Sequence, residues 1–182
     1  MNDKNIILSL AEFPDLRLRT IGKEDIENLR IWKNTNKTSF FLSSDITSEQ
    51  QEKWYENFTA RSDDYMFIVE QNVAADWKAI GCQGFRKLAD EGCVDAYNII
   101  RAIKIEPASF TMSDAFRMML VFADSLFEDL PIRCKVLVNN PAVEWYKKND
   151  FSIVDRVNDE YYSMELSKDS LKNYNLIIKN TR

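Results

Sequence analysis

The sequence predicts a single mixed α/β (α+β) domain arranged around one sheet. Its 182 residues are enough for one hydrophobic core and leave little room for a second. Hydrophobic residues make up 45% of the chain and charged residues 29%, so disordered, collagen-like and membrane-spanning classes are not indicated. The predicted order is strand, two helices, three strands, long helix, strand, short helix and two strands, which is a mixed layout around one sheet.

The first predicted elements are one strand and two helices. Residues 16–21 alternate apolar and polar side chains, which predicts a half-buried strand. Apolar residues recur at helical spacing from 24 to about 34, and they predict the first helix. A capping box formed by Thr47 and Gln50 opens a second amphipathic helix that runs to about residue 61.

The middle of the chain predicts a meander of strands followed by the clearest helix of the sequence. Three β-rich runs lie at residues 65–70, 77–85 and 94–105. Thr111 and Asp114 resemble a capping box with Asp in place of Glu. Apolar residues then trace a wide helix face as far as Phe127, which predicts a long helix.

The last third predicts a strand, a short helix and a closing hairpin, at residues 133–138, 140–148 and 151–166. Asn140-Pro141 is a favoured N-cap and first-turn pair for the short helix. Asn158-Asp159 supplies the hairpin turn. The tail after Ser167 fits either a short helix or a strand, and the sequence does not decide between them.

Residue counts exclude several kinds of chemistry. The chain has no His, so a Ser-His-Asp triad, a Cys-His dyad or an imidazole zinc site cannot be built from it. Cys82, Cys93 and Cys134 contain no C-x-x-C pair, so they indicate neither a disulfide framework nor a metal cage, and we expect small buried hydrophobes and no metal. The net charge of -5, with no block of like charge, indicates no nucleic-acid or membrane partner.

The apolar segments indicate neither a secretory signal nor a membrane span. The run at residues 6–8 is too weak for a signal peptide. The longest apolar stretch elsewhere, 118–123, is far shorter than the roughly 20 residues that cross a bilayer. We therefore expect a cytoplasmic protein.

One stretch of the second half carries a family resemblance. It reads Val136-Leu-Val-Asn139-Asn-Pro-Ala142-Val-Glu-Trp-Tyr146-Lys-Lys-Asn-Asp-Phe151. It resembles the strand, Asn, short helix, Tyr and Gly-Phe signature of the GNAT family of acyl-CoA-dependent N-acyltransferases. The spacing of seven from Asn139 to Tyr146 matches the family, whereas Asp150 replaces the family's Gly as a turn variant.

The resemblance implies a fold and an activity. It implies one GNAT-like domain over residues 1–182, with the motifs in about 16–166 and a C-terminal tail at 167–182. The fold would be a central, mostly antiparallel sheet flanked by helices. The activity would be acetyl transfer from acetyl-CoA to the amine of a small molecule by direct attack in a ternary complex, and a homodimer is allowed.

The resemblance also implies site residues on the donor side. Tyr146 would be the catalytic acid that protonates the leaving CoA thiolate, unless it only forms the core face of its helix. The expected cofactor-binding residues are Ile103 and Ile105 through backbone amides, Ser113, Asp114 and Ala115 at the pyrophosphate, and Asn139 at the pantetheine arm. Within the pyrophosphate loop only Ala115 fits the family's Gly-rich pattern, and a carboxylate at Asp114 would repel phosphate if it pointed inward.

The front half has a narrower likeness. Arg30-Ile-Trp32-Lys-Asn34, followed by Ile46-Thr-Ser-Glu-Gln-Gln-Glu-Lys-Trp54-Tyr55, resembles the head of GNAT enzymes that acetylate nucleotide-linked aminosugars, including those of the pseudaminic-acid pathway. The substrate-binding residues would be Trp32, Asn34 and Arg101, with Lys33 as further positive charge. Trp32 and Trp54 could instead be core residues, and Arg101 could pair with a structural carboxylate.

Alternatives remain at the level of function. The base that deprotonates the amine could be Asp95, Glu106, Tyr97 or water. The acceptor could be a protein or peptide α-amine, which would need an acidic or open groove and which a Trp32 sealed in the core would favour. A non-catalytic GNAT-like binding protein is the third reading, because the pyrophosphate loop is poor in Gly and contains Asp114.

Overall fold

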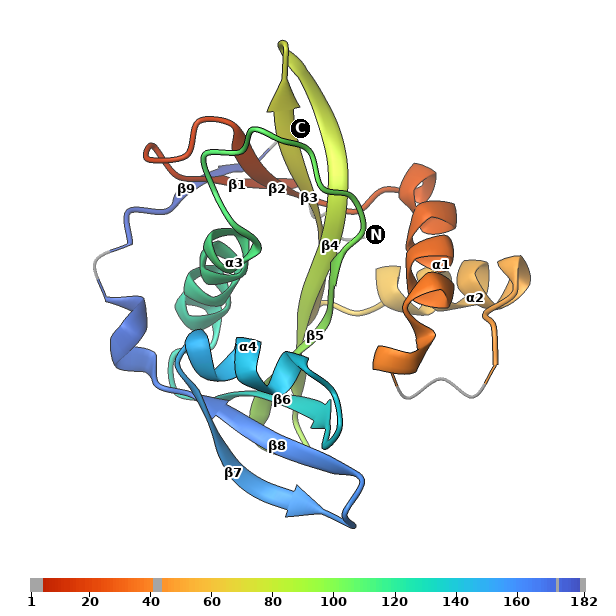
Figure 1. Ribbon diagram of the computed structural model, residues 1–182, viewed down its shortest axis with the longest axis vertical. Coiled ribbons are helices and arrows are strands. Elements are labelled where there is room, and N and C mark those ends of the chain that lie inside the picture. The colour runs from red at the N-terminus through yellow and green to blue at the C-terminus, as the bar shows by residue number, and fades with distance from the viewer. Residues whose placement is uncertain (1–4, 41–43, 173, 181–182) are drawn as a thin grey trace.

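The computed structural model describes residues 5–40, 44–172 and 174–180, which form one sheet with helices on both faces (Figure 1). The strands of the described chain are β1 Ile6–Ser9, β2 Leu16–Thr20, β3 Asp64–Val73, β4 Asp76–Leu88, β5 Cys93–Arg101, β6 Ile132–Leu137, β7 Phe151–Val157, β8 Tyr161–Leu166 and β9 Ile177–Asn180. The helices are α1 Ile26–Thr35, α2 Ser48–Thr59, α3 Met112–Leu126 and α4 Ala142–Lys148, with short 3₁₀ turns η1 Lys23–Asp25, η2 Lys37–Ser39 and η3 Lys168–Leu171.

The strand order is β7-β8-β6-β5-β4-β3-β2-β1-β9, and neighbouring strands are antiparallel except β5 and β6. The predicted meander is β3-β4-β5, and the predicted closing hairpin is β7-β8. The expected fold class, a mixed α/β domain with a mostly antiparallel central sheet, is confirmed.

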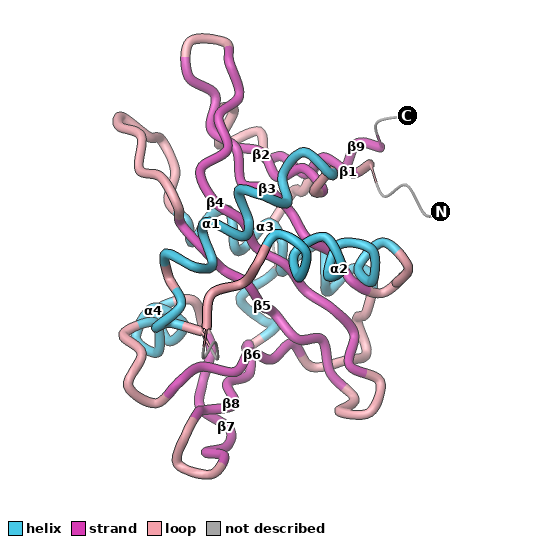
Figure 2. Tube along the Cα trace, turned by 90° about the vertical axis from the view of Figure 1, so that its right-hand side faces the viewer, coloured by secondary structure: helices cyan, strands magenta, loops and turns pink. Residues whose placement is uncertain are grey.

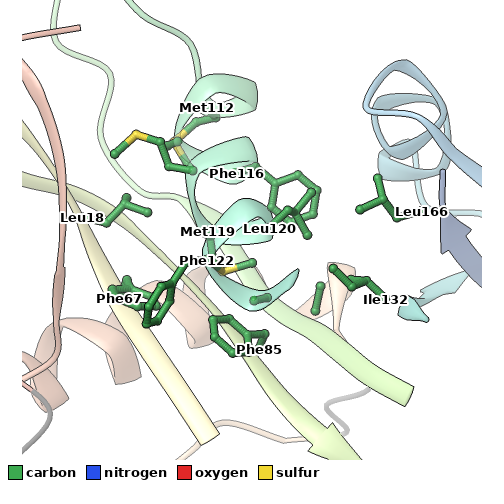
Figure 3. Close-up of a cluster of buried hydrophobic side chains, with 14 of the residues drawn as sticks. Leu18, Phe67, Phe85, Met112, Phe116, Met119, Leu120, Phe122, Ile132 and Leu166 are labelled. Carbon is green, nitrogen blue, oxygen red and sulfur yellow. The ribbon is translucent and has the colours of Figure 1, made fainter. Parts of the chain in front are cut away.

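The larger core lies between the sheet and α3 (Figure 3). Thr111 caps α3 as predicted, because its side-chain oxygen accepts from the Asp114 N–H while the Asp114 carboxylate accepts from the Thr111 N–H. The α3 residues Phe116, Met119 and Phe122 are buried against the sheet. Each side chain of this size contributes about 1.5–3 kcal/mol when it is fully removed from water, so this face fixes α3 on the sheet.

The opposite face of the sheet is covered by α1 and α2, which lie in front of the strands in Figure 2. A smaller apolar cluster joins α1 to strands β3, β4 and β5. Its buried members are Ile21, Leu29, Trp32, Met66, Ile68, Cys82 and Ile100. Ligands that enter between strands therefore meet α3 and α4 on one side and α1 and α2 on the other.

The parallel neighbours β5 and β6 diverge soon after they meet. Their register pairs are Val94 with Ile132 and Asp95 with Arg133. Beyond these pairs β6 continues along β8, while β5 continues along β4 in another direction (Figure 1). The remaining edge of β5, residues 96–101, therefore has no strand of the described chain beside it on the β6 side.

Two features differ from the sequence prediction. The strand expected over 94–105 ends at Arg101, because the N–H groups of Ala102 and Ile103 both donate to the Ile80 carbonyl at 2.9 and 3.0 Å and the ladder stops there. Strand β1 was not expected, whereas β9 is one of the two alternatives left open for the tail. They are four residues each and pair with one another across nearly the whole chain length.

The turn before β7 explains a departure from the family signature. Asp150 has a φ of 65°, in the left-handed region that Gly adopts without strain and that Asp tolerates better than most residues. Its carboxylate also pairs with Arg117 of α3 at 2.8 Å. The predicted turn variant is thus consistent with the backbone seen here.

Candidate functional site

The divergence of β5 and β6 opens a cavity of about 530 Å³, a usual volume for a small-molecule site. Its floor is β5 from Asp95 to Arg101, with Arg86 of β4. On the α4 side the lining residues are Lys135, Val136, Asn140, Ala142 and Tyr146. On the α1 and α2 side they are Lys33, Asn36, Ser39, Phe40 and Trp54.

Asn140 holds these two sides together. Its side-chain oxygen accepts from the N–H of Ala142, the first residue of α4, at 2.9 Å, whereas the N-cap position is Pro141 and lies one residue later than the sequence predicted. Its side-chain N–H donates to the Ser39 carbonyl at 3.0 Å, across to η2. One amide therefore sets the width of the cavity at this point.

Tyr146 lies in the wall of the cavity, as the motif suggested. Its ring packs among aromatic neighbours, with centroids at 5.9 Å from Phe116, 5.4 Å from Phe151 and 5.1 Å from Trp145. Burial raises its pKa well above the usual value of a phenol, and the hydroxyl has no hydrogen-bond partner among the described residues. The phenol therefore stays protonated at neutral pH and is available to a ligand.

The floor of the cavity contains a β-bulge. Gly84 pairs with Tyr97 and Cys82 with Ile100, so β5 has one residue more than β4 in between. Asn98 occupies the bulge with a φ of 54°, and its carbonyl accepts from the Cys82 thiol at 3.5 Å. A bulge leaves a residue outside the ladder, so backbone groups of β5 point away from β4 here.

A polar network crosses the floor on the α1 and α2 side. Two N–H groups of Arg86 donate to one Asp95 oxygen at 3.0 and 3.1 Å, and its guanidinium lies 4.8 Å above the Tyr97 ring. The Tyr97 hydroxyl donates to the buried Asp64 carboxylate. Burial raises the pKa of Asp64 and of Asp95, and burial together with the Asp64 charge raises the pKa of Tyr97.

The first turn of α3 does not present a row of free N–H groups to a phosphate, because Asp114 and Thr111 bond to one another there. The Asp114 carboxylate is turned back on the helix end, where the N–H and hydroxyl of Thr111 donate to it at 2.7 and 2.8 Å. The N–H groups of Asp114 and Ala115 contact the Thr111 carbonyl at 3.2 and 3.3 Å, whereas the Ser113 N–H has no acceptor within the described chain. The Ala115 carbonyl accepts from Gln83 at 2.7 Å, which ties this turn to β4.

Two expected cofactor contacts are placed differently from the prediction. The Ile103 N–H already donates to Ile80, so the unpaired strand edge ends at Arg101, before Ile103 and Ile105. Asn139 is exposed in the turn after β6 and does not belong to the lining, whereas its neighbour Asn140 does. The sequence contained a signal that Asn140, and not Asn139, would line the cavity, since Asn140 comes directly before the predicted short helix with its Pro141.

Two expected substrate contacts are structural here. Trp32 is buried in the core cluster beneath α1 and does not line the cavity. Asn34 uses both ends of its amide on Ile46, donating to the carbonyl at 3.0 Å and accepting from the N–H at 2.8 Å, and Arg30 adds a bond to the same carbonyl at 3.2 Å. Residues of the front motif therefore bind the backbone of Ile46, which lies just before α2.

Trp54 takes the place expected of Trp32, because Trp54 lines the cavity. Arg101, the third expected substrate contact, also lines it, from the exposed end of β5. Sequence reasoning missed Arg86 and Asp64. A usable signal was the opposite charge of Arg86 and Asp95 on strands expected to pair, since such pairs favour facing positions.

Among the candidate bases, Asp95 and Tyr97 line the cavity, whereas Glu106 is exposed and pairs with Lys104 at 2.8 Å. All three cysteines are buried, as expected of small hydrophobes. Burial raises the pKa of Cys82 to about 12, so this thiol is protonated and does not offer a nucleophile. The described residues contain no cluster of acidic or thiol side chains that could hold a metal, and none of their helices is long and apolar enough to cross a membrane.

Comparison with known proteins is informative at the level of structure. No family model and no curated protein matches the sequence. Apo FdhC, described as a nucleotide-linked sugar GNAT, matches with a TM-score of 0.70 and 16% identity, over 90% of this chain and 93% of that one. The chain has the GNAT fold. A spermidine N-acetyltransferase from Vibrio cholerae, solved with CoA and spermine, matches with a TM-score of 0.68 and 17% identity, over 87% and 99% of the two chains.

A domain from Methanocaldococcus jannaschii DSM 2661 also matches, with a TM-score of 0.69 at 13% identity over 83% of this chain and 97% of that one. At identities of 13–17% the likeness establishes the fold. The chemical class of the acceptor has to be inferred from the residues that line the cavity.

Proposed function

We propose that this protein is an acetyl-CoA-dependent N-acetyltransferase that acts on the amine of a small acceptor. The observation that carries the proposal is the cavity between β5 and β6, which has a buried, protonated Tyr146 in one wall and aromatic and cationic side chains in the other. Two substrates can meet there from opposite faces of the sheet. The cysteines are protonated and buried, which favours direct attack by the amine over an acyl-enzyme.

The donor side fits the acyl arm of acetyl-CoA. The edge of β5 at residues 96–101 has no neighbouring strand on the β6 side, and such an edge can bind the amides of an extended ligand as an added strand would. Bound acetyl-CoA would supply a thioester carbonyl. A backbone N–H at the Asn98 bulge is our candidate for polarising that carbonyl.

The wall residue Tyr146 holds a proton where a leaving thiolate needs one. Its raised pKa keeps the hydroxyl protonated at neutral pH, and its aromatic neighbours exclude water. At the pyrophosphate end, Ser113 offers an N–H while Asp114 places a negative charge on the same helix turn. The residues present therefore fit the acyl end better than the phosphate end.

For the acceptor we favour a nucleotide-linked aminosugar. A peptide acceptor would need an acidic or open groove, whereas this cavity combines Phe40 and Trp54 with the cations Lys33 and Arg86. Trp32 gives no support, because its ring is in the core, and by itself its burial favours the peptide alternative. We give more weight to the residues that line the cavity, because they are the ones an acceptor would touch.

The test is titration of the full chain with acetyl-CoA, followed by acetyl transfer to 4-amino-sugar nucleotides and to a panel of peptides. We expect acetyl-CoA to bind and the aminosugar nucleotides to be acetylated in preference to the peptides. Equal activity on peptides would assign the acceptor to that class. No heat and no thermal shift at millimolar acetyl-CoA would leave the non-catalytic binding protein, which Asp114 favours. The homodimer and the cytoplasmic location remain predictions.

A further inference from the structure

Lys33 is a partly buried cation of the cavity that has no counterion among the described residues. Lys33 extends from α1 into the cavity lining. No carboxylate pairs with it in the described part of the chain. Burial lowers its pKa, and the nearby Arg86 lowers it further, although the Cys82 thiol acts in the opposite direction. Partial burial of an unpaired ammonium is unfavourable for the free protein.

The other cations near Lys33 differ from it, because Arg101, also unpaired among the described residues, is exposed at the end of β5 and the rest have carboxylate partners. Arg86 is neutralised by Asp95 at 3.0 Å, and Lys135 by Glu91 at 2.8 Å. On the same side of the cavity Lys37 pairs with Asp45 at 2.8 Å and is exposed. Lys33 therefore has a charge and up to three hydrogen-bond donors that no described side chain satisfies.

The charge balance of the cavity is opposite to that of the whole chain. The lining residues include four cations, Lys33, Arg86, Arg101 and Lys135, and one carboxylate, Asp95, whereas the net charge of the protein is -5. A cavity lined mainly by positive charges attracts negatively charged ligands and raises their local concentration. A polyamine, whose remaining amines stay cationic, would be repelled by this lining.

We propose that Lys33 binds an oxyanion, phosphate or carboxylate, of the acceptor, so that the substrate class is small amines that also carry a negative group. The inference rests on the proposed function, because it takes the α1 and α2 side of the cavity as the acceptor side. Lys33 makes a charge-assisted bond to the oxyanion. Phe40 and Trp54 stand beside it in the lining and offer apolar surface to a ring.

The experiment measures binding of matched amines to the full chain by calorimetry. The pairs are glucosamine 6-phosphate with glucosamine, a nucleoside-diphosphate 4-amino sugar with its free sugar, and an amino acid with its amide, together with spermidine. We expect the anionic member of at least one pair to bind about tenfold or more tighter than its neutral partner. Which pair shows the difference tells phosphate from carboxylate.

The variants are Lys33→Gln, Lys33→Arg and the control Lys37→Gln. Lys33→Gln should weaken the anionic member about 10- to 100-fold and leave the neutral member within about threefold, whereas Lys33→Arg keeps the charge and most of the affinity. Lys37→Gln should change neither. Tight binding of spermidine, absence of binding by every anionic member, or equal loss of both members in Lys33→Gln would overturn the proposal.

Acetyl-CoA titration keeps the two proposals apart. If the oxyanion binds through Lys33 and acetyl-CoA does not bind, the acetyltransferase proposal fails and the Lys33 site stands. If acetyl-CoA binds and the anionic amines are bound and acetylated equally by wild type and Lys33→Gln, the Lys33 site fails alone.

Discussion

Tyr146 is a polar group that the fold places among aromatic rings. Burying a phenol without a partner is unfavourable, so a hydroxyl kept in this wall calls for a ligand or a reaction that uses it. Its raised pKa also rules it out as a base at neutral pH, which leaves the role of proton donor. At this position packing and the proposed proton donation are compatible, since the ring packs against aromatic neighbours and the residue lines the cavity.

Removal of that hydroxyl is the first prediction. Tyr146→Phe keeps the ring packing and should lower kcat by about 10²-fold or more, with little change in the affinity for acetyl-CoA. Steady-state kinetics and calorimetry measure the two quantities. The matched control is Tyr162→Phe, on β8 and outside the cavity lining, which should leave both unchanged. Normal turnover in Tyr146→Phe would assign the residue to packing.

The second prediction concerns the bulge at Asn98. With a φ of 54°, this position suits Gly and Asn and strains other residues. Asn98→Ala should therefore lower the free energy of unfolding by about 1 kcal/mol, whereas Asn98→Gly should change it by less, as measured by urea denaturation. A loss of acetyl transfer in both variants with unchanged stability in Asn98→Gly would indicate that the side chain itself is used.

The site shows what a motif can and cannot reveal at the scale of single residues. Tyr146 was found because its spacing from Asn139 is set by the strand-to-helix turn. Trp32 and Asn34 were expected to bind substrate, and the structure places Trp32 in a core cluster and bonds Asn34 to Ile46, which are positions that a Trp and an Asn on an amphipathic helix fill equally well. Orientation decides between these roles, and a short motif does not contain it.

At the scale of elements, the N-terminus of α3 is where fold and proposed function are in conflict. Helix N-termini favour anions, and here the nearest anion is the helix's own Asp114. The capping box stabilises the helix and at the same time occupies the end that a diphosphate would use. Weak binding of acetyl-CoA would be the expected cost of this arrangement.

The third prediction concerns the charge of Asp114 at the N-terminus of α3. Asp114→Asn removes the charge while its side-chain oxygen can still accept from the Thr111 N–H. Acetyl-CoA should then bind more tightly, by about 3- to 10-fold, because the repulsion of a nearby like charge is removed. Stability should fall by about 0.5–1 kcal/mol. Calorimetry and thermal unfolding measure both, and an unchanged affinity would place the pyrophosphate elsewhere.

Most elements could be predicted because their signals are local. Capping boxes at Thr47 and Thr111 and the turn at Asn158 each lie within four residues of the element they define. Strands β1 and β9 could not be predicted in the same way, since their pairing joins residues such as Ile6 and Asn180. The tail turned out to contain both expected alternatives, a short 3₁₀ turn and a strand.

At the scale of the whole molecule, buried carboxylates should give the stability a recognisable pH dependence. Asp64 is buried and accepts a hydrogen bond from Tyr97, and burial raises its pKa in the folded state. A raised carboxyl pKa contributes stability that is fully present below the ordinary value and is lost as pH rises through the folded value. The folded protein therefore tolerates Asp64 best when this side chain is protonated.

The fourth prediction is measured in the Asp64→Asn variant, which keeps the acceptor for Tyr97 without the charge. Relative to wild type, the free energy of unfolding of this variant should become larger as pH is raised from about 4 to 7, because only wild type loses the stability contributed by the raised pKa of Asp64. Urea denaturation at several pH values measures the difference. The exposed Asp90→Asn is the control and should stay within about 0.5 kcal/mol of wild type throughout. If the difference in free energy of unfolding between Asp64→Asn and wild type did not change with pH, the proposed rise in the pKa of Asp64 would be contradicted.

Because β5 and β6 share only two register pairs, we expect the sheet to behave as two cooperative units. The ribbon β6-β8-β7 joins the larger half through the register pairs Val94–Ile132 and Asp95–Arg133, through the Lys135–Glu91 ion pair and through side chains of the core around α3. Its amides should exchange with deuterium sooner than those of β3 and β4, because it can open without unfolding the rest. A ligand that contacts both β5 and β6 in the cavity between them would slow amide exchange in both units together. Whether the cavity is occupied could then be measured from amide protection alone, whatever the acceptor is.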